Sequence, residues 1–227
     1  MLSKRLIVSL VGVLSAISWT STEAHAQGRG RGFGRMMSAE ATRMRLLGID
    51  KVVEALKLTD EQKPELAKVT AAYGEEMQGL RSGGFQNLSQ EERTKRFAEV
   101  QEKTKATWEK CEKILTSEQV ERVKQISRQA RGANALEDED VMLALKLSDD
   151  QKKQLETIRD AAGQEMRGAF QPGGDQEAAR KKAAEIRKSA GEKSLAVLSD
   201  EQKKEFEKLQ GEKIELPEGA LLGQPRR

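Results

Sequence analysis

Apolar residues recur every three or four positions through most of this chain, and this period predicts helices rather than strands. The two clearest series are Leu66, Val69, Tyr73, Met77 and Leu80, and Phe97, Val100, Thr104, Trp108, Cys111 and Ile114. Charged and amide side chains cover the other faces, so each series forms a narrow apolar seam of the coiled-coil kind. Between the two series, Gly83 and Gly84 end one helix, and Ser89 with Glu92 provides a capping box for the next. The pattern predicts a pair of long antiparallel helices.

A short motif, Leu followed by Thr or Ser and then by Gln three residues later, occurs four times. Its residues are Leu58, Thr59 and Gln62; Leu115, Thr116 and Gln119; Leu147, Ser148 and Gln151; and Leu198, Ser199 and Gln202. The hydroxyl is expected to cap a helix N-terminus, and the Gln side chain to reach back to the backbone N–H of the cap. The Leu before the cap anchors the entering chain. Because capping accounts for every residue type, we interpret the motif as structural.

The order of these motifs indicates an internal repeat. Leu58 and Met77 recur with the same spacing as Leu147 and Met166, and a shorter loop separates the long helices of the second copy. The predicted fold is therefore all-α, with two tandem helical-hairpin units. Each unit has a short helix, a long antiparallel hairpin and a third helix. The units are expected to span residues 46–136 and 137–216, with a C-terminal tail at 217–227.

The first residues read as an export signal. Two basic residues precede an apolar run from Leu6 to Trp19, and a polar stretch then ends in an Ala-His-Ala pattern at residues 24–26. Such a pattern predicts a signal peptide over residues 1–26, cleaved between Ala26 and Gln27. The alternative is an uncleaved membrane anchor, for which the apolar run is short. We expect an exported, periplasmic protein that is soluble after cleavage.

Removal of the signal peptide limits the available chemistry. The single histidine, His25, leaves with it, and Cys111 is the only cysteine, so the usual general base and an intramolecular disulfide are both missing. No nucleophile motif is present, and the acidic residues are spread over solvated faces. The sequence therefore predicts a protein that is not an enzyme and that has no cofactor and no metal site.

Charge is unevenly distributed along the chain. The formal net charge is +3 and the isoelectric point is near 8.9, but an Arg/Gly-rich leader at residues 27–45 carries most of the positive charge. This leader is similar in composition to the RGG segments of RNA-binding proteins, yet export argues against nucleic acid. We expect a flexible leader, with weak contact to anionic surfaces as the alternative.

Three further features each allow two interpretations. The acidic run at residues 137–140 either opens a helix or binds calcium, although it lacks the loop spacing and glycine of a calcium site. Met36, Met37 and Met44 form a weak anchoring patch or bind a soft metal. Cys111 lies on an apolar seam and is predicted to be buried, with an intermolecular disulfide or a reactive thiol as the alternative.

Each predicted unit resembles the LTxxQ family of periplasmic stress proteins typified by Spy and CpxP. The pairs "LKLTDEQ" with "ILTSEQ" and "LKLSDDQ" with "VLSDEQ" match the two motifs of that family in order, and they cover nearly the whole exported chain twice. The resemblance implies an all-helical cradle that binds non-native proteins without ATP, or an accessory to envelope-stress sensing. The near-neutral body differs from the basic Spy dimer, and the lack of histidine puts metal sensing in doubt.

From these features we expect an exported, ATP-independent, chaperone-like binder of unfolded or envelope proteins. The alternative is a helical structural or regulatory module that docks an envelope stress sensor or another envelope protein. The candidate client contacts are apolar residues near the loops, namely Met77, Leu80, Phe85, Met166 and Phe170. A chain with two units is predicted to be a monomer whose units pair about a pseudo-two-fold axis. Stacking of the units in line is the alternative.

Overall fold

The computed structural model of the chain describes residues 38–82, 88–170 and 175–217. Within these residues there is no strand, and the predicted all-α fold is confirmed. The helices are α2 (Ala39–Leu46), α3 (Asp50–Ala55), α4 (Gln62–Ser82), α5 (Gln90–Ile114), α6 (Ser117–Arg131), the 3-10 helix η3 (Gly132–Glu137), α7 (Glu139–Ala144), α8 (Asp149–Ala169), α9 (Gln176–Ala196) and α10 (Asp200–Gln210). None of the described helices is long and apolar enough to cross a bilayer. The expected signal peptide and its cleavage site at Ala26 and Gln27 lie outside the described residues.

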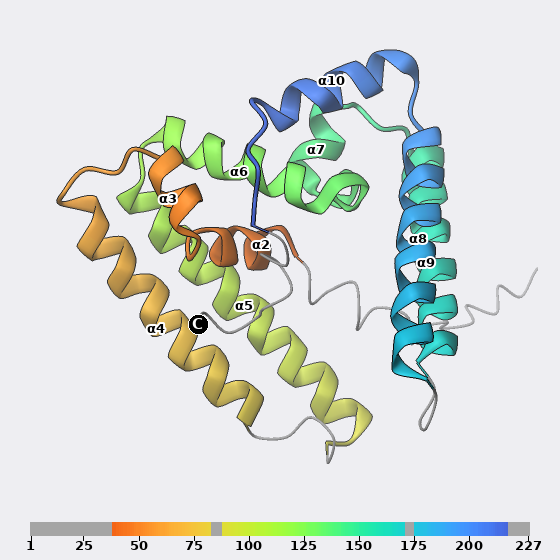
Figure 1. Cartoon of the computed structure of the whole chain (residues 1–227), viewed down its shortest axis with the longest axis horizontal. Coiled ribbons are helices and arrows are strands. Elements are labelled where there is room, and N and C mark those ends of the chain that lie inside the picture. The colour runs from red at the N-terminus through yellow and green to blue at the C-terminus, as the bar shows by residue number, and fades with distance from the viewer. Residues whose placement is uncertain (1–37, 83–87, 171–174, 218–227) are drawn as a thin grey trace, which may run out of the picture.

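Helices α4 and α5 pack side by side along the apolar seams that the sequence predicts (Figure 1). The packed surfaces of these helices and of α2, which lies against α5, bury apolar side chains. They are Leu66 and Met77 of α4 and Trp108 and Cys111 of α5. The capping box at the start of α5 is also present, because the Ser89 N–H donates to the Glu92 carboxylate at 2.7 Å and the Glu92 N–H donates to the Ser89 hydroxyl at 3.2 Å. The helix end expected at Gly83 and Gly84 lies outside the described residues.

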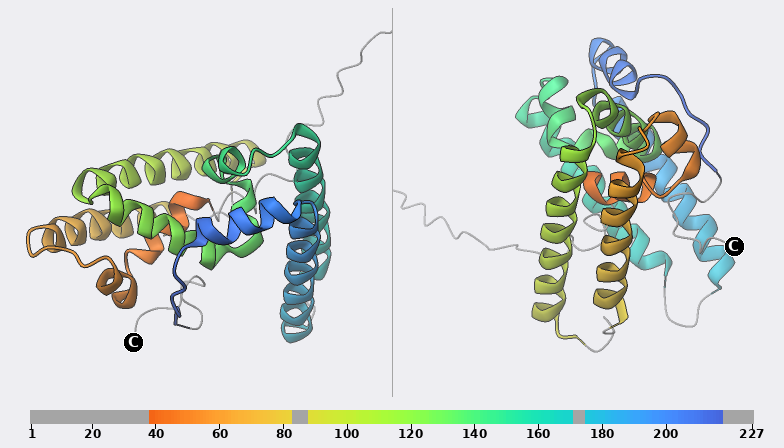
Figure 2. Two further views of the ribbon diagram at one scale, coloured as in Figure 1. Left: turned by 90° about the horizontal axis from the view of Figure 1, so that it is seen from above. Right: turned by 90° about the vertical axis from the view of Figure 1, so that its left-hand side faces the viewer.

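Helices α8 and α9 form a second packed pair, and it buries little. Leu155 is the buried residue of α8, and those of α9 are Ala179, Ala183 and Ile186. The order α3, α4, α5, α6 thus recurs as α7, α8, α9, α10. Figure 2 shows that the two hairpins leave their common base in different directions. This base is built from α2, α6, η3, α7 and α10.

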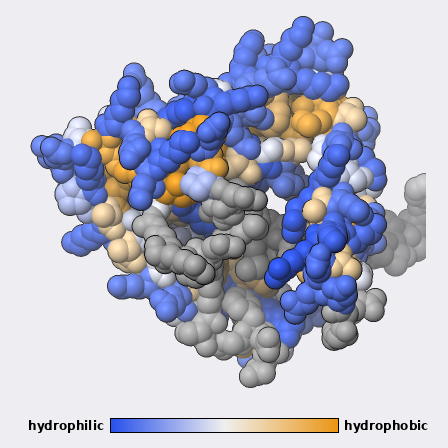
Figure 3. All heavy atoms as spheres, viewed as in Figure 1, coloured by the Kyte–Doolittle hydropathy of each residue, from blue (hydrophilic) through white to orange (hydrophobic). Residues whose placement is uncertain are grey.

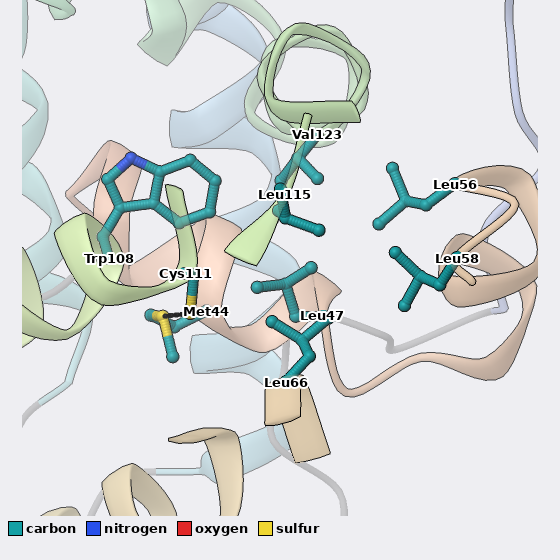
Figure 4. Packing of buried hydrophobic residues seen from close by; sticks show 9 residues of the cluster. All are labelled: Met44, Leu47, Leu56, Leu58, Leu66, Trp108, Cys111, Leu115 and Val123. Atoms are coloured by element: carbon teal, nitrogen blue, oxygen red, sulfur yellow. Dashed lines mark hydrogen bonds between the residues drawn. The ribbon is translucent and has the colours of Figure 1, made fainter. Parts of the chain in front are cut away.

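Helix α2 was not expected from the sequence, which places residues 27–45 in a flexible leader. Ser38 caps this helix by accepting a hydrogen bond from the Ala41 N–H at 3.2 Å. Met44 is buried in a cluster with Leu47, Leu56, Leu58, Leu66, Trp108, Cys111, Leu115 and Val123 (Figure 4). Met44 therefore belongs to the core and not to a surface anchoring patch. Met36 and Met37 lie outside the described residues.

The predicted boundary between the two units, at residue 136, falls within the 3-10 helix η3. Ala135 and Leu136 are fully buried, and they pack with α7, α8 and α10 in the second hydrophobic cluster. The helix α6 ends at Gly132, which has a positive φ of 54°. A glycine tolerates this conformation without steric penalty.

The last described segment, residues 211–217, returns to the first unit. Ile214 and Leu216 pack against Leu46, Val52 and Ile126, each of which is fully buried. Helices α6 and α10, which occupy equivalent places in the two units, contact each other. A contact between equivalent helices supports the predicted pseudo-two-fold pairing, which stays a prediction.

Candidate functional site

Each of the four repeated motifs caps a helix. In every copy the Gln N–H donates to the Thr or Ser hydroxyl at 3.2 Å, and the N–H of that Thr or Ser donates to the Gln Oε1 at 2.9–3.0 Å. The four Leu residues that precede the caps are buried. Helix α4 itself begins at Gln62. The Lys63 N–H donates to the Thr59 carbonyl, but Pro64 has no N–H to form the next bond of the helix, so the regular pattern starts only after this gap.

The glutamines have a second role that the sequence reading missed. The Gln62 Nε2 donates to the Gln119 Oε1 at 2.9 Å, and the Gln119 Nε2 donates to the Gln62 Oε1 at 3.0 Å. The same two amides donate to the carbonyls that end the preceding helices, at Ile114 (2.8 Å) and Leu56 (3.1 Å). We call this arrangement the glutamine clasp. It joins the start of α4 and the start of α6, together with the ends of α3 and α5, into one hydrogen-bonded group.

The second unit contains an equivalent clasp. Gln151 and Gln202 donate to each other's Oε1 atoms at 2.7 and 3.1 Å, and to the carbonyls of Val197 and Leu145 at 3.0 and 3.1 Å. A capping box accepts Glu as readily as Gln, as Glu92 shows. Only an amide can donate as well as accept. The presence of Gln, and not Glu, in all four motifs was therefore the feature of the sequence that could have indicated the clasp.

Replacing Thr59 with Ala tests the capping role alone. The change removes one hydroxyl acceptor at an exposed position, so the free energy of unfolding is expected to fall by about 1 kcal/mol. Urea unfolding followed by circular dichroism measures this change. Protein binding by the variant should decline only as far as folding does. Full stability combined with loss of binding would instead show that the motif contacts a ligand.

A cleft of about 570 Å³ is lined by residues of both units at their base. Its walls come from α2, α5, α6, η3, α7 and α8, and they carry residues of both charges around one exposed Leu143. Beneath it, Arg128 is buried and donates to Glu121 of its own helix, to Asp140 at the start of α7 and to the Leu209 carbonyl of α10, each at 2.8 Å. Arg128 thus ties α6 to two helices of the second unit.

The carboxylates of this base have different electrostatic environments. Burial would raise the pKa of Asp140, but the hydrogen bond from Arg128 and the charges of Arg128 and Arg43 bring it below its ordinary value. Burial raises the pKa of Asp138 even though Arg131 is paired with it, and its Oδ2 has no hydrogen-bond partner. The Arg128 hydrogen bond thus favours the charged form of Asp140, whereas burial disfavours the charged form of Asp138.

Cys111 is fully buried, as predicted from its place on the seam, and its Sγ lies 3.8 Å from the Met44 Sδ (Figure 4). Burial raises the pKa of its thiol to about 11. Because the thiolate is the reactive form, we expect Cys111 in the folded chain to react with Ellman's reagent at pH 8 at least 100-fold more slowly than in urea. A labelling rate equal to that of the denatured chain would contradict this assignment.

The candidate client contacts differ in accessibility. Phe170, at the end of α8, is 50% exposed, whereas Leu80 and Met166 are partly buried. Met77 is buried in the α4–α5 seam because it shares a helix face with Leu66, so it is unavailable unless the hairpin opens. Phe85 lies outside the described residues. Leu143 and Leu195 are large exposed apolar residues that the sequence reading did not select.

Other sequence alternatives concern metals. The acidic residues Glu139 and Asp140 lie in the first turn of α7, as predicted for a helix start. Across residues 38–82, 88–170 and 175–217, no group of three or more His, Cys, Asp or Glu side chains is placed to hold a metal ion.

Comparison with known proteins gives one match. A family model described as a domain of unknown function (DUF4890) matches residues 26–122, which is less than half of the chain. The matched region includes both motifs of the first unit and stops within α6, before the second unit begins. No curated protein matches the chain, and no solved structure matches it.

Proposed function

We propose that this chain is an exported, ATP-independent, chaperone-like binder of non-native or partner proteins in the cell envelope. The observation that carries the proposal is the exposure of large apolar side chains on an otherwise charged helical surface, namely Leu143, Phe170 and Leu195. Figure 3 shows apolar residues gathered around α3, α6 and α10, while the outer surfaces of the hairpins are mostly hydrophilic. Contiguous apolar surface with a polar surround, of the kind gathered around α3, α6 and α10, is typical of sites that contact other proteins.

The thin second hairpin supports this function. Of the four residues that α8 and α9 bury, two are alanines, so little apolar surface holds the pair together. Segments with few buried apolar contacts open locally at low free-energy cost. Local separation of α8 and α9 would uncover Met166, which is partly buried, and Ile186, which is buried. Such a surface adapts to clients of different shape without any chemical step, which agrees with the expectation that the chain is not an enzyme.

The motifs contribute to this function indirectly. Each clasp fixes where a hairpin leaves the base, and Arg128 links the two units, so the apolar residues of both hairpins are held on one frame. A chaperone-like function is also what the resemblance to the LTxxQ family implies. In this proposal the motif residues position the binding surface and do not contact the client.

Suppression of aggregation by reduced α-lactalbumin, followed by light scattering without ATP, tests the proposal. The chain is expected to suppress scattering at a few-fold molar excess. Phe170→Ser should weaken suppression at least two-fold, and Arg167→Ser, an exposed change on the same helix, should not. No suppression by the folded chain at ten-fold excess would reject the chaperone-like function and leave docking to one envelope partner.

A further inference from the structure

The segment at residues 211–217, which we call the strap, lies against the first unit although it follows α10 of the second (Figure 1). It begins at Gly211, whose positive φ of 62° turns the chain back. A Cβ at this position would collide with the Gln125 side chain. The surface beneath the strap is formed by the apolar residues Leu46, Ile49, Val52 and Ile126, flanked by Arg122 and Gln129. We call it the strap surface.

The strap surface contacts the backbone of its occupant more than the side chains. The Gln129 Nε2 donates to the carbonyls of Gln210 and Glu212 at 2.6 and 2.7 Å, and its Oε1 accepts from the Ile214 N–H at 3.0 Å. Arg122 donates to the same Glu212 carbonyl at 2.8 Å. Every residue except proline offers these backbone groups, so such bonds tolerate changes of sequence.

Side-chain selectivity comes from alternate positions. Ile214 and Leu216 are partly buried against the apolar centre of the strap surface. Glu215, which lies between them, is exposed, and its Oε2 lies 3.8 Å from the Lys51 Nζ. Residues two apart share a face of an extended chain. The surface therefore fits an extended segment with two aliphatic side chains on either side of an acidic one.

The strap is held by polar contacts more than by apolar burial. It has no helix of its own, and besides the hydrogen bonds of Gln129 and Arg122 it contributes two partly buried aliphatic side chains to the contact. Ordering an irregular segment has an entropic cost per residue that offsets such gains. Separation of the strap would expose Leu46, Val52 and Ile126 to water, which is unfavourable unless another apolar group covers them. A segment from outside the chain with the same chemistry would supply one.

We propose that the strap surface is a binding site for extended, acidic peptide segments of other proteins with aliphatic side chains two residues apart. The strap is the competing occupant within the chain. Because the strap is covalently attached, its effective concentration is high, and an outside peptide binds only as far as the strap is released. The site lies apart from Phe170 and the second hairpin and does not depend on the chaperone-like function.

Fluorescence anisotropy with a labelled synthetic peptide of residues 211–217 tests the proposal on the full chain. The Ile214→Ala/Leu216→Ala variant, which weakens the strap and leaves its surface intact, is expected to bind the peptide at least ten-fold more tightly than the parent chain. Adding Gln129→Ala should reverse that gain. The control peptide has the same composition with Ile and Leu adjacent, and it should bind at least ten-fold more weakly because one aliphatic side chain then faces away.

Two results from the strap variant would overturn the proposal. One is a strap-weakened variant with unchanged helix content that binds no better than the parent chain, or that binds both peptides equally. The other is a parent chain that has the mass of two chains by light scattering, while the variant with the strap substitutions has the mass of one. This result would mean that the strap surface is occupied by the strap of a second copy.

Hydrogen exchange of the parent chain gives a readout that needs no variant. The Ile214 amide should exchange at least 100-fold faster than that of Ile126, and equal rates would show that the strap is a fixed part of the core.

Discussion

Replacing Arg128 with Ala is expected to lower the free energy of unfolding by about 1.5–3 kcal/mol, because the change removes hydrogen bonds from a buried guanidinium to two carboxylates and a carbonyl. Arg128 has a side-chain exposure of only 5%, and it donates to Glu121, Asp140 and the Leu209 carbonyl. The change leaves Asp140 and the end of α10 without this donor. Because these bonds join the two units, unfolding in urea is expected to separate into two transitions.

Arg159→Ala is the matched control for this change. Arg159 also pairs with several carboxylates, Glu137 among them, but its side chain is 36% exposed. Exposed ion pairs contribute about 0–1 kcal/mol, so this variant should unfold close to the parent chain. A similar small effect of Arg128→Ala would show that the buried pairs do not hold the units together.

The pH dependence of the same variant provides an independent readout. The pKa of Asp140 in the folded chain lies below its ordinary value of 3.8. A lowered folded pKa adds stability above the unfolded pKa, and this stability disappears as the pH falls through the folded value. The parent chain should therefore lose an increment of stability below about pH 4 that Arg128→Ala has already lost. Urea unfolding at pH 7 and pH 3 measures the difference.

Replacing Gln119 with Ala is expected to lower the free energy of unfolding by about 2–4 kcal/mol, because the side chain takes part in four hydrogen bonds of about 1 kcal/mol each. It accepts from the Thr116 N–H and from Gln62, and it donates to Gln62 and to the Leu56 carbonyl. The loss should exceed that of Thr59→Ala. Gln119→Glu keeps the accepting oxygens but cannot donate, so its loss should be intermediate.

Glu92→Ala is the matched control for the clasp. Glu92 closes the same kind of capping box at the start of α5, but at an exposed position and outside either clasp. Its loss should be about 1 kcal/mol. A double-mutant cycle of Gln62→Ala and Gln119→Ala isolates the coupling between the two amides. If Gln119→Ala costs no more than Glu92→Ala, the clasp adds nothing to capping.

The sequence by itself determined the all-α fold, the seams of α4 and α5 and the four motif-capped helix starts. These features are local, because apolar period and capping involve residues within a few positions of each other. The burial of Cys111 followed from its place on a seam in the same way. The prediction of an exported protein rests on residues 1–27, which lie outside the described structure.

Only the tertiary structure decided which surfaces these helices share. Helix α2 has Arg at positions 43 and 45, which resembles a charged leader in sequence, yet the Arg43 guanidinium lies 5.5 Å from the centre of the Trp108 ring and Met44 fills the core. Met77, a predicted client contact, is instead buried in the packed α4–α5 pair. The clasps, the Arg128 link and the strap each join residues that are far apart in the chain. Their partners depend on how the helices pack, and no local pattern of residues specifies that packing.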